Sequence, residues 1–143
     1  MAIPQLPTKL TLEIVTPDRS LGRETVDEVQ VPAAEGYMGF LPGHTPLLAM
    51  LQIGELTYRK GQERFHLHVA FGFVEVLPDR VTILAQVGER AEDIDIARAE
   101  AAKKRAEQRL AQPLMNVDFE RARIAMMKSL IRLQVAARAR TRA

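Results

Sequence analysis

Residues 65–71, with the sequence FHLHVAF, decide the class of fold, because apolar residues occupy every second position in them. Successive side chains of a β-strand point to opposite faces of a sheet, so this alternation predicts a strand with one buried face. The same period recurs on both sides, at residues 10–14 and 81–85. Turn-forming residues such as 78–80 (PDR) separate the alternating runs. Short strands at this spacing predict a β-sandwich or barrel over about residues 6–89.

The C-terminal third has a helical period instead. Apolar residues recur at intervals of three and four over residues 96–110, which predicts a helix from Asp93 or Asp95 to about Gln112. An aspartate at its start caps exposed backbone N–H groups and complements the positive end of the helix dipole. Pro113 is expected to end this helix.

A second helix is expected to follow a short turn over residues 113–117. Asp118 is its candidate N-cap. Its expected apolar stripe consists of Phe119, Ala122, Met126, Leu130 and Leu133, supplemented by Ile131 and Val135. Because the turn is short, the two helices are expected to form an antiparallel hairpin.

The net charge changes sign along the chain at about the place where the periodicity of apolar residues changes from that of strands to that of helices. Residues 1–93 carry 8 Lys or Arg and 13 Asp or Glu, a net charge of −5. Residues 94–143 carry 12 Lys or Arg and 5 Asp or Glu, a net charge of +7. All eight glycines lie in the first part. This break predicts two structural units with different roles, at residues 1–90 and 91–143.

Composition excludes several kinds of site. The chain has no cysteine, which excludes disulfides, thiolate nucleophiles, iron–sulfur clusters and cysteine-based zinc sites. No apolar run approaches the roughly 18 residues that a membrane-spanning helix needs. No GxSxG or HExxH motif occurs, and no pair of carboxylates is placed for acid–base catalysis. We therefore expect no enzyme active site in this chain.

The three histidines allow more than one interpretation. His66 and His68 share one face of the expected strand and could bind a metal ion, although two exposed strand histidines are more often only solvated. His44 lies in a loop rich in glycine and proline and is expected to make a structural hydrogen bond.

That loop, residues 36–48 (GYMGFLPGHTPLL), contains three glycines and two prolines, which implies several tight turns. One interpretation is a corner of the sandwich folded onto its core. The other is an apolar surface loop that docks a partner. The candidate docking residues are Tyr37, Met38, Phe40, Leu41 and His44.

The helical region also carries candidate binding residues. Arg98 and Arg105 share one helix face, as do Lys128 and Arg132, and folding back would bring the two pairs together. Asp95 could then bind a ribose hydroxyl or a base amino group, with the cations holding phosphates. A solvated basic surface, a nucleic-acid-binding tail and an amphipathic helix on a membrane surface are the alternatives.

Taken together, the chain resembles the epsilon subunits of F-type ATP synthases from about residue 10 to residue 136. The matching segments are residues 10–18 (LTLEIVTPD), 36–48, 53–56 (IGEL), 72–76 (GFVEV) and 94–99 (IDIARA), the last matching the family pattern [IL]DxxRA. The resemblance implies an α+β protein in two units, an N-terminal β-sandwich followed by a C-terminal antiparallel two-helix hairpin.

The resemblance also implies a function, that of a non-catalytic part of the central rotor. The sandwich binds the gamma subunit and the polar loops of the c-ring, coupling proton flow to ATP synthesis. The hairpin regulates the complex by inhibiting ATP hydrolysis, extending toward the alpha and beta subunits. Tyr37 departs from relatives that carry an acid at this position of the c-ring contact.

In family members that bind ATP, the nucleotide is a regulatory ligand and no cofactor is required. The corresponding residues here are Glu89, Ile94, Asp95, Arg98, Ala99, Arg105, Lys128 and Arg132. Lys128 stands where binding members have arginine. A lysine is a point charge and does not replace the planar, bidentate guanidinium group without loss of affinity.

After Glu120 the second helix is basic and has no acidic residue, which suggests a charge-complementary brake on acidic segments of the alpha and beta subunits. The residues expected to act there are Arg121, Arg123, Lys128, Arg132, Arg138 and Arg140. The alternative to a rotor subunit is a free-standing nucleotide- or nucleic-acid-binding module, whereas the rotor interpretation involves no nucleic acid.

Residues 1–10 resemble neither a secretory signal nor a transit peptide. Together with the family resemblance, this predicts a peripheral location on the cytoplasmic face of a bacterial plasma membrane. The equivalent thylakoid face is expected if the gene is plastid-encoded.

Overall fold

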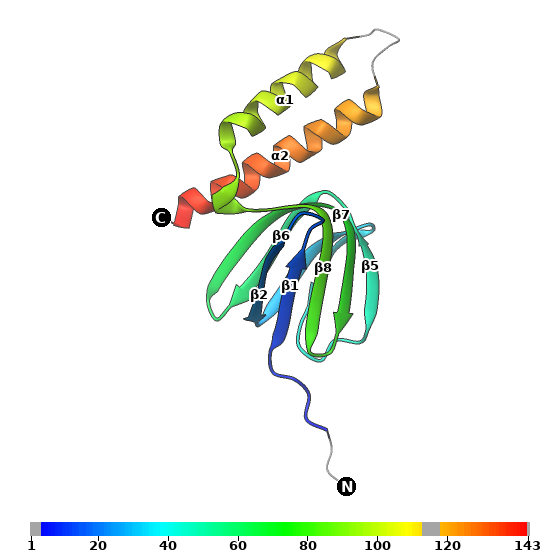
Figure 1. Ribbon diagram of the computed structural model, residues 1–143, viewed down its shortest axis with the longest axis vertical. Coiled ribbons are helices and arrows are strands. Elements are labelled where there is room, and N and C mark those ends of the chain that lie inside the picture. Colours follow the sequence, from blue (N-terminus) through cyan, green and yellow to red (C-terminus); the bar gives the residue numbers. More distant parts are fainter. Residues whose placement is uncertain (1–3, 113–117, 143) are drawn as a thin grey trace. The chain divides into compact units, whose positions relative to one another are not determined.

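The computed structural model describes residues 4–112 and 118–142. The chain divides into two compact units, Met1–Glu89 and Arg90–Ala143. The first unit is built from strands and the second from helices, as the change of period predicts (Figure 1).

Eight strands form the first unit (Figure 1). In chain order they are β1 (Leu10–Val15), β2 (Ser20–Val26), β3 (Glu28–Ala33), β4 (Gly36–Phe40), β5 (Leu47–Leu51), β6 (Gly54–Lys60), β7 (Glu63–Leu77) and β8 (Arg80–Arg90). Hydrogen bonds connect them in the order β2-β1-β8-β7-β5-β3-β4, and β6 pairs with both β3 and β7. β1 and β8 run parallel, with Thr11 opposite Arg80 and Val15 opposite Leu84.

The long strand β7 passes from one layer of the sandwich to the other. Its first half, from Glu63 to Val69, pairs with β6, and its second half, from Gly72 to Val76, pairs with β5. The bend lies between the halves, where Phe71 has φ 60° and Gly72 has φ 117°. A Cβ atom on residue 72 would lie 2.0 Å from the carbonyl oxygen of Leu84. Only glycine fits there, because it lacks the Cβ and tolerates positive φ.

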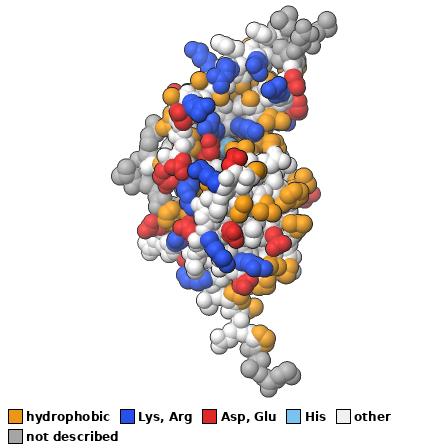
Figure 2. Space-filling view, viewed as in Figure 1, with side chains coloured by type: hydrophobic (Ala, Val, Ile, Leu, Met, Phe, Trp, Pro, Cys, Tyr) orange, Lys and Arg blue, Asp and Glu red, His pale blue; other side chains and the backbone are white. Residues whose placement is uncertain are grey.

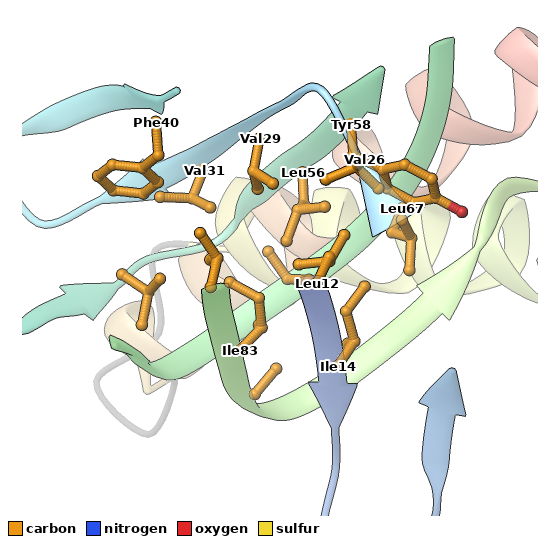
Figure 3. Packing of buried hydrophobic residues seen from close by; sticks show 14 of the residues in the cluster. Leu12, Ile14, Val26, Val29, Val31, Phe40, Leu56, Tyr58, Leu67 and Ile83 are labelled. Carbon is orange, nitrogen blue, oxygen red and sulfur yellow. The ribbon is translucent and has the colours of Figure 1, made fainter. Parts of the chain in front are cut away.

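The core lies between the two layers and contains the alternating residues of the strands. Figure 3 shows side chains of one layer facing Leu12, Ile14 and Ile83 of the other. Tyr58 stacks on Phe65 with the ring centroids 4.9 Å apart. Leu10, Leu12, Ile14, Val81, Ile83 and Ala85 are all buried, so the predicted alternation is confirmed at β1 and β8.

The second unit begins with a short 3₁₀ helix, Ala91–Asp93, and continues with α1 (Ile96–Ala111) and α2 (Phe119–Arg142). Both predicted caps are confirmed. The Asp95 carboxylate accepts a hydrogen bond from the Arg98 backbone N–H at 3.1 Å. The Asp118 carboxylate accepts one from the Arg121 backbone N–H at 3.0 Å. The turn predicted over residues 113–117, including Pro113, lies outside the described residues.

The helices α1 and α2 lie side by side and antiparallel (Figure 1). Neither described helix is long and apolar enough to cross a membrane. Small residues seven positions apart are buried on each of them: Ala99 and Ala106 on α1, and Ala122, Ser129 and Ala136 on α2.

The apolar stripe predicted for α2 is therefore partly wrong. Ala122 and Val135 are buried and Ile131 is partly buried, as predicted. Phe119 and Leu130 are exposed instead, and Ser129 takes a buried position in the stripe. The Ser129 hydroxyl donates to the Ala125 carbonyl at 2.8 Å, which satisfies the polar group within its own helix. A small, internally bonded side chain lets the helices approach closely, whereas Phe119 and Leu130 would hold them apart.

Candidate functional site

The first candidate site is an exposed apolar face on the outer side of the sandwich. Four large side chains form it, each between 47% and 68% exposed: Leu48 and Met50 on β5, Phe73 on β7 and Leu84 on β8. Met50 lies directly opposite Phe73 in the register of β5 and β7, and β8 is the next strand. We call these four residues the apolar face. Figure 2 shows hydrophobic side chains gathered on the side of the sandwich where Figure 1 places β5 and β8.

Two shallow hollows flank Phe73 and Leu48. One, of about 320 Å³, is lined by Phe73, Leu84 and Pro17 among others. The other, of about 380 Å³, is lined by Leu48, Glu75 and Leu77 among others. Apolar side chains beside open hollows are a surface into which a partner's side chains can insert.

The apolar face was not predicted from the sequence, because the alternation of apolar residues locates only the buried side of each strand. The signal was present: Leu84 lies between the core residues Ile83 and Ala85, and Met50 lies beside Leu51. A strand that is apolar on both faces is typical of a sheet covered on both sides.

The glycine- and proline-rich loop is partly folded onto the core and partly exposed. It consists of strand β4, a turn and the start of β5. Phe40 is fully buried in the core, so its side chain is not available to a partner, and Met38 packs partly against the core. Tyr37 and Leu41 are each more than half exposed.

Hydrogen bonds fix the exposed part of this loop. The Glu55 backbone N–H donates to the Tyr37 hydroxyl at 3.2 Å, and the Gly43 backbone N–H donates to the Pro78 carbonyl at 2.7 Å. His44 donates from Nδ1 to the Thr45 carbonyl at 2.6 Å, which is the structural hydrogen bond expected of it. The His44 ring meets Phe40 edge to face. Tyr37 and Leu41 are thus presented on a fixed backbone.

The expectation of two exposed strand histidines is wrong. His68 is only 1% exposed and donates from Nδ1 to Glu89 Oε2 at 3.1 Å. His66 is half-buried and pairs through Nδ1 with Glu55 Oε1 at 3.0 Å. Each ring is committed to a different carboxylate. Within residues 4–112 and 118–142, no group of three or more His, Asp or Glu side chains is placed to hold a metal ion.

The second candidate site is one side of the helical hairpin. Arg98 and Arg105 each directly precede a buried alanine of α1, and Lys128 directly precedes Ser129 of α2. Each residue turns a helix by about 100°, so the positions just before the interface project to the same side of two antiparallel helices. Arg132 follows Ser129 by three residues and falls on that side as well. Arg109 and Arg121 fall there by the same geometry. We call this side the cationic flank.

The opposite side of the hairpin is mixed in charge. Glu100, Lys103, Glu107 and Arg123 fall there by the same geometry, and Lys103 pairs with Glu107 at 3.8 Å. The cationic flank is therefore the side that favours an anionic ligand, because several guanidinium and ammonium groups lie along it.

The remaining residues of the predicted ATP set have structural partners. Asp95 caps α1, as described above, and Ile94 and Ala99 are buried. Ile94 belongs to a small apolar cluster with Ala91, Val135 and Ala136. Glu89 is the last residue of the sandwich unit, where it accepts the hydrogen bond from His68.

The predicted basic surface of α2 is only partly exposed. Arg121, Arg123 and Arg138 are exposed, whereas Lys128 and Arg132 are half-buried. Arg123 pairs with Glu120, which raises the pKa of its guanidinium group. The side chain of Arg140 lies outside the described residues.

Known proteins resemble this chain along almost its whole length. The ATP synthase epsilon chain of Solibacter usitatus is 52% identical over 131 residues, covering 92% of this chain and 98% of that protein. That of Herpetosiphon aurantiacus is 47% identical over 133 residues, covering 93% of this chain and 98% of that protein.

Among solved structures, a chain of the Euglena gracilis mitochondrial ATP synthase (OSCP/F1/c-ring) has the same fold. Its TM-score is 0.79 at 23% identity, with 95% of this chain and 85% of that chain covered. A chain of the Tetrahymena thermophila mitochondrial ATP synthase (central stalk/c-ring) gives a TM-score of 0.56 at 15% identity, covering 94% of this chain and 98% of that chain.

Both units match a described domain of one family. Residues 9–91 match the β-sandwich domain of the ATP synthase delta/epsilon chain, and residues 92–137 match its long α-helix domain. The two matches together account for the strands and for most of the hairpin. The chain therefore belongs to the family of ATP synthase epsilon chains, which are non-catalytic subunits of the stalk of the F-type enzyme.

Proposed function

We propose that this chain is a rotor component of the central stalk and that the apolar face docks the gamma subunit. The single observation that carries this proposal is the cluster of four exposed large side chains on a sheet whose core is already complete. Covering such a face removes apolar area from water at roughly 25 cal/mol per Å². A partner that supplies complementary apolar side chains would therefore hold the sandwich firmly in the complex.

We propose a second contact at the loop, where Tyr37, Leu41 and His44 meet the polar loops of the c-ring. Support comes from the exposure of Tyr37 and Leu41 on a backbone that is fixed by hydrogen bonds. Because Tyr37 is an uncharged aromatic residue, this contact depends less on salt than one made through an acid. With both contacts, the proposed location is peripheral, on the cytoplasmic face of a bacterial plasma membrane or on the equivalent thylakoid face.

We propose that the hairpin regulates ATP hydrolysis and binds ATP on the cationic flank. Arg98, Arg105, Lys128 and Arg132 supply the charge for the phosphates, and Lys128 gives weaker binding than an arginine would. Glu89 and Asp95 are the candidate acceptors for ribose or base groups. When extended, the basic helix α2 would meet acidic segments of the alpha and beta subunits.

Docking is tested by measuring the affinity of purified gamma subunit for the full-length chain by calorimetry. Phe73→Asp is expected to weaken binding about 100-fold, because a buried aromatic anchor is lost and a charge is placed in the interface. Leu6→Asp, which changes an exposed leucine outside the apolar face, is the matched control. Equal affinities for all three proteins would overturn docking through this face.

ATP binding is tested by titrating the full-length chain with ATP beside Arg98→Ala and Lys128→Arg. Loss of saturable binding in Arg98→Ala and tighter binding in Lys128→Arg are expected. Lys103→Arg, on the mixed side of the hairpin, is the control. Absence of binding at millimolar ATP would leave the hairpin without this ligand.

Inhibition is tested separately, by the hydrolysis rate of the assembled complex. Neutralising Arg132, Arg138 and Arg140 together is expected to weaken inhibition, since the charge that meets the alpha and beta subunits is removed. Unchanged inhibition would mean that these arginines do not act as the brake.

A further inference from the structure

His68 is an unusual residue for its position. It lies on β7 between the core residues Leu67 and Val69, so its side chain points to the opposite face of the strand. Even so, that side chain is almost completely buried. Nδ1 donates to Glu89, but Nε2 is buried and has no hydrogen-bond partner among residues 4–112 and 118–142. A buried polar atom without a partner destabilises a fold by about 1–3 kcal/mol. An apolar side chain at this position would avoid that penalty.

What His68 holds is the last residue of the sandwich. Glu89 ends the first compact unit, and Arg90 begins the second. Just before it, Gly88 is closely packed, because a Cβ atom there would lie 2.9 Å from Leu21 Cδ1 and 3.2 Å from Thr16 Cγ2. The end of β8 is thus fixed at two successive residues, by packing at Gly88 and by the imidazole at Glu89.

Two glutamates lie near His68 on the neighbouring strands. Glu55 lies directly opposite His68 in the register of β6 and β7, but its Oε1 atom pairs with His66 and is 3.5 Å from the Thr57 hydroxyl. The Glu89 carboxylate is 24% exposed and comes from β8. The His66–Glu55 pair joins the neighbouring strands β7 and β6. The His68–Glu89 pair instead holds the last residue of the first unit, directly before the second unit begins.

We propose that the hydrogen bond from His68 to Glu89 is a latch that fixes the end of β8, so that the hinge of the chain lies after Glu89. With the latch closed, movement of the second unit begins at Arg90. With the latch open, the last residues of β8 detach from the sandwich and the hinge segment lengthens. The consequence for hydrolysis rests on the proposed regulatory role of the hairpin, but the latch itself does not.

The latch is tested in the isolated full-length chain by hydrogen exchange of the backbone amides of residues 88–90. His68→Leu fills the buried space without a donor and is expected to speed exchange there about fivefold, the effect of losing one hydrogen bond. His68→Asn, which can place an N–H near the position of Nδ1, is expected to restore most of the protection. Unchanged exchange in His68→Leu would overturn the latch.

A double-mutant cycle separates a latch from a loss of general stability. Glu89→Met removes the accepting oxygens, and once it is present His68→Leu is expected to add nothing at residues 88–90, because the acceptor of the His68 hydrogen bond is already gone. His66→Leu is the matched control, and its effect is expected to be the same with and without Glu89→Met. Additive effects of His68→Leu and Glu89→Met would overturn the latch even if both variants fold.

The functional arm uses the reassembled complex. If the hairpin regulates hydrolysis, His68→Leu is expected to change the degree of inhibition and His68→Asn to return it toward the original value. Faster exchange in a complex without any hairpin-dependent inhibition would confirm the latch and overturn the proposed regulation. Changed inhibition without faster exchange would overturn the latch alone.

Discussion

The sandwich joins its parts with large apolar side chains, whereas the hairpin joins its two helices with small ones. Tyr58, Phe40 and Leu67 fill the space between the layers of the sandwich, but Ala99, Ala106 and Ser129 lie between the helices. Burying a leucine or phenylalanine stabilises a fold by about 1.5–3 kcal/mol, and an alanine offers far less area. The sandwich is therefore expected to be stable by itself and the hairpin to open at a lower free energy. This difference favours the hairpin as the unit that rearranges.

The largest effect on stability is expected at the bend of β7 in the sandwich. Gly72→Ala is expected to lower the free energy of unfolding by about 3–5 kcal/mol, because the new Cβ overlaps the Leu84 carbonyl and φ is positive. Urea denaturation followed by the circular dichroism of the strands measures the change. Gly39→Ala, with open space around residue 39, should change stability little. Similar values for the two variants would contradict the role of the bend.

The hairpin should respond to added volume at the contact between its helices. Ala106→Leu adds volume between closely packed helices and is expected to cost about 1–3 kcal/mol. Ala101→Leu, on an exposed position of α1, is the control. Hydrogen exchange in α1 and α2 gives the free energy of opening. Slower exchange in Ala106→Leu would show that the interface has room for larger side chains and would remove the contrast.

A smaller effect is expected at the start of α2. Asp118→Ala removes the side chain that accepts from the Arg121 N–H and is expected to destabilise the helix by about 1 kcal/mol. Exchange of the first-turn amides of α2 is the measurement. Asp118→Asn retains an accepting oxygen and should keep most of the protection. If both variants behave alike, the charge near the helix dipole matters more than the cap.

The smallest effect is a pH dependence of stability that arises in the sandwich. Lys9 and the Gly61 backbone N–H both donate to Asp27, and the hydrogen bond from Lys9 is the main reason that the pKa of this carboxyl is lowered. A lowered pKa contributes stability above the pKa of the unfolded chain, near 3.8, and this contribution disappears as pH falls through the folded value. In Asp27→Asn the urea midpoint should therefore fall less between pH 5 and pH 2. Parallel curves for the two proteins would contradict this assignment.

Sequence alone predicted the elements better than their outer surfaces. The alternation at Leu12, Ile14 and Ile83 located the core, since a strand places every second residue inward. Asp95 and Asp118 located the helix starts for an equally local reason, because a cap acts on the backbone two or three residues away.

What escaped prediction depends on contacts between distant residues. Phe40 lies among apolar loop residues, but only the pairing of β3 with β4 directs it inward. His68 looks like a solvated strand residue until Glu89, 21 positions later, is found beside it. The apolar face likewise needs β5, β7 and β8 to be neighbours before its four residues form one surface.

The parallel pairing of β1 with β8 has a consequence for how the protein is made. β1 is synthesised first, but its partner at residues 80–84 comes about seventy positions later. During translation β1 can pair early with β2, but its other edge stays open until β8 has left the ribosome. Contacts between such distant segments slow folding and expose strand edges meanwhile. The helical hairpin, whose contacts are more local, is translated last. The slow pairing of β1 with β8 therefore forms while the fast-folding hairpin is being synthesised.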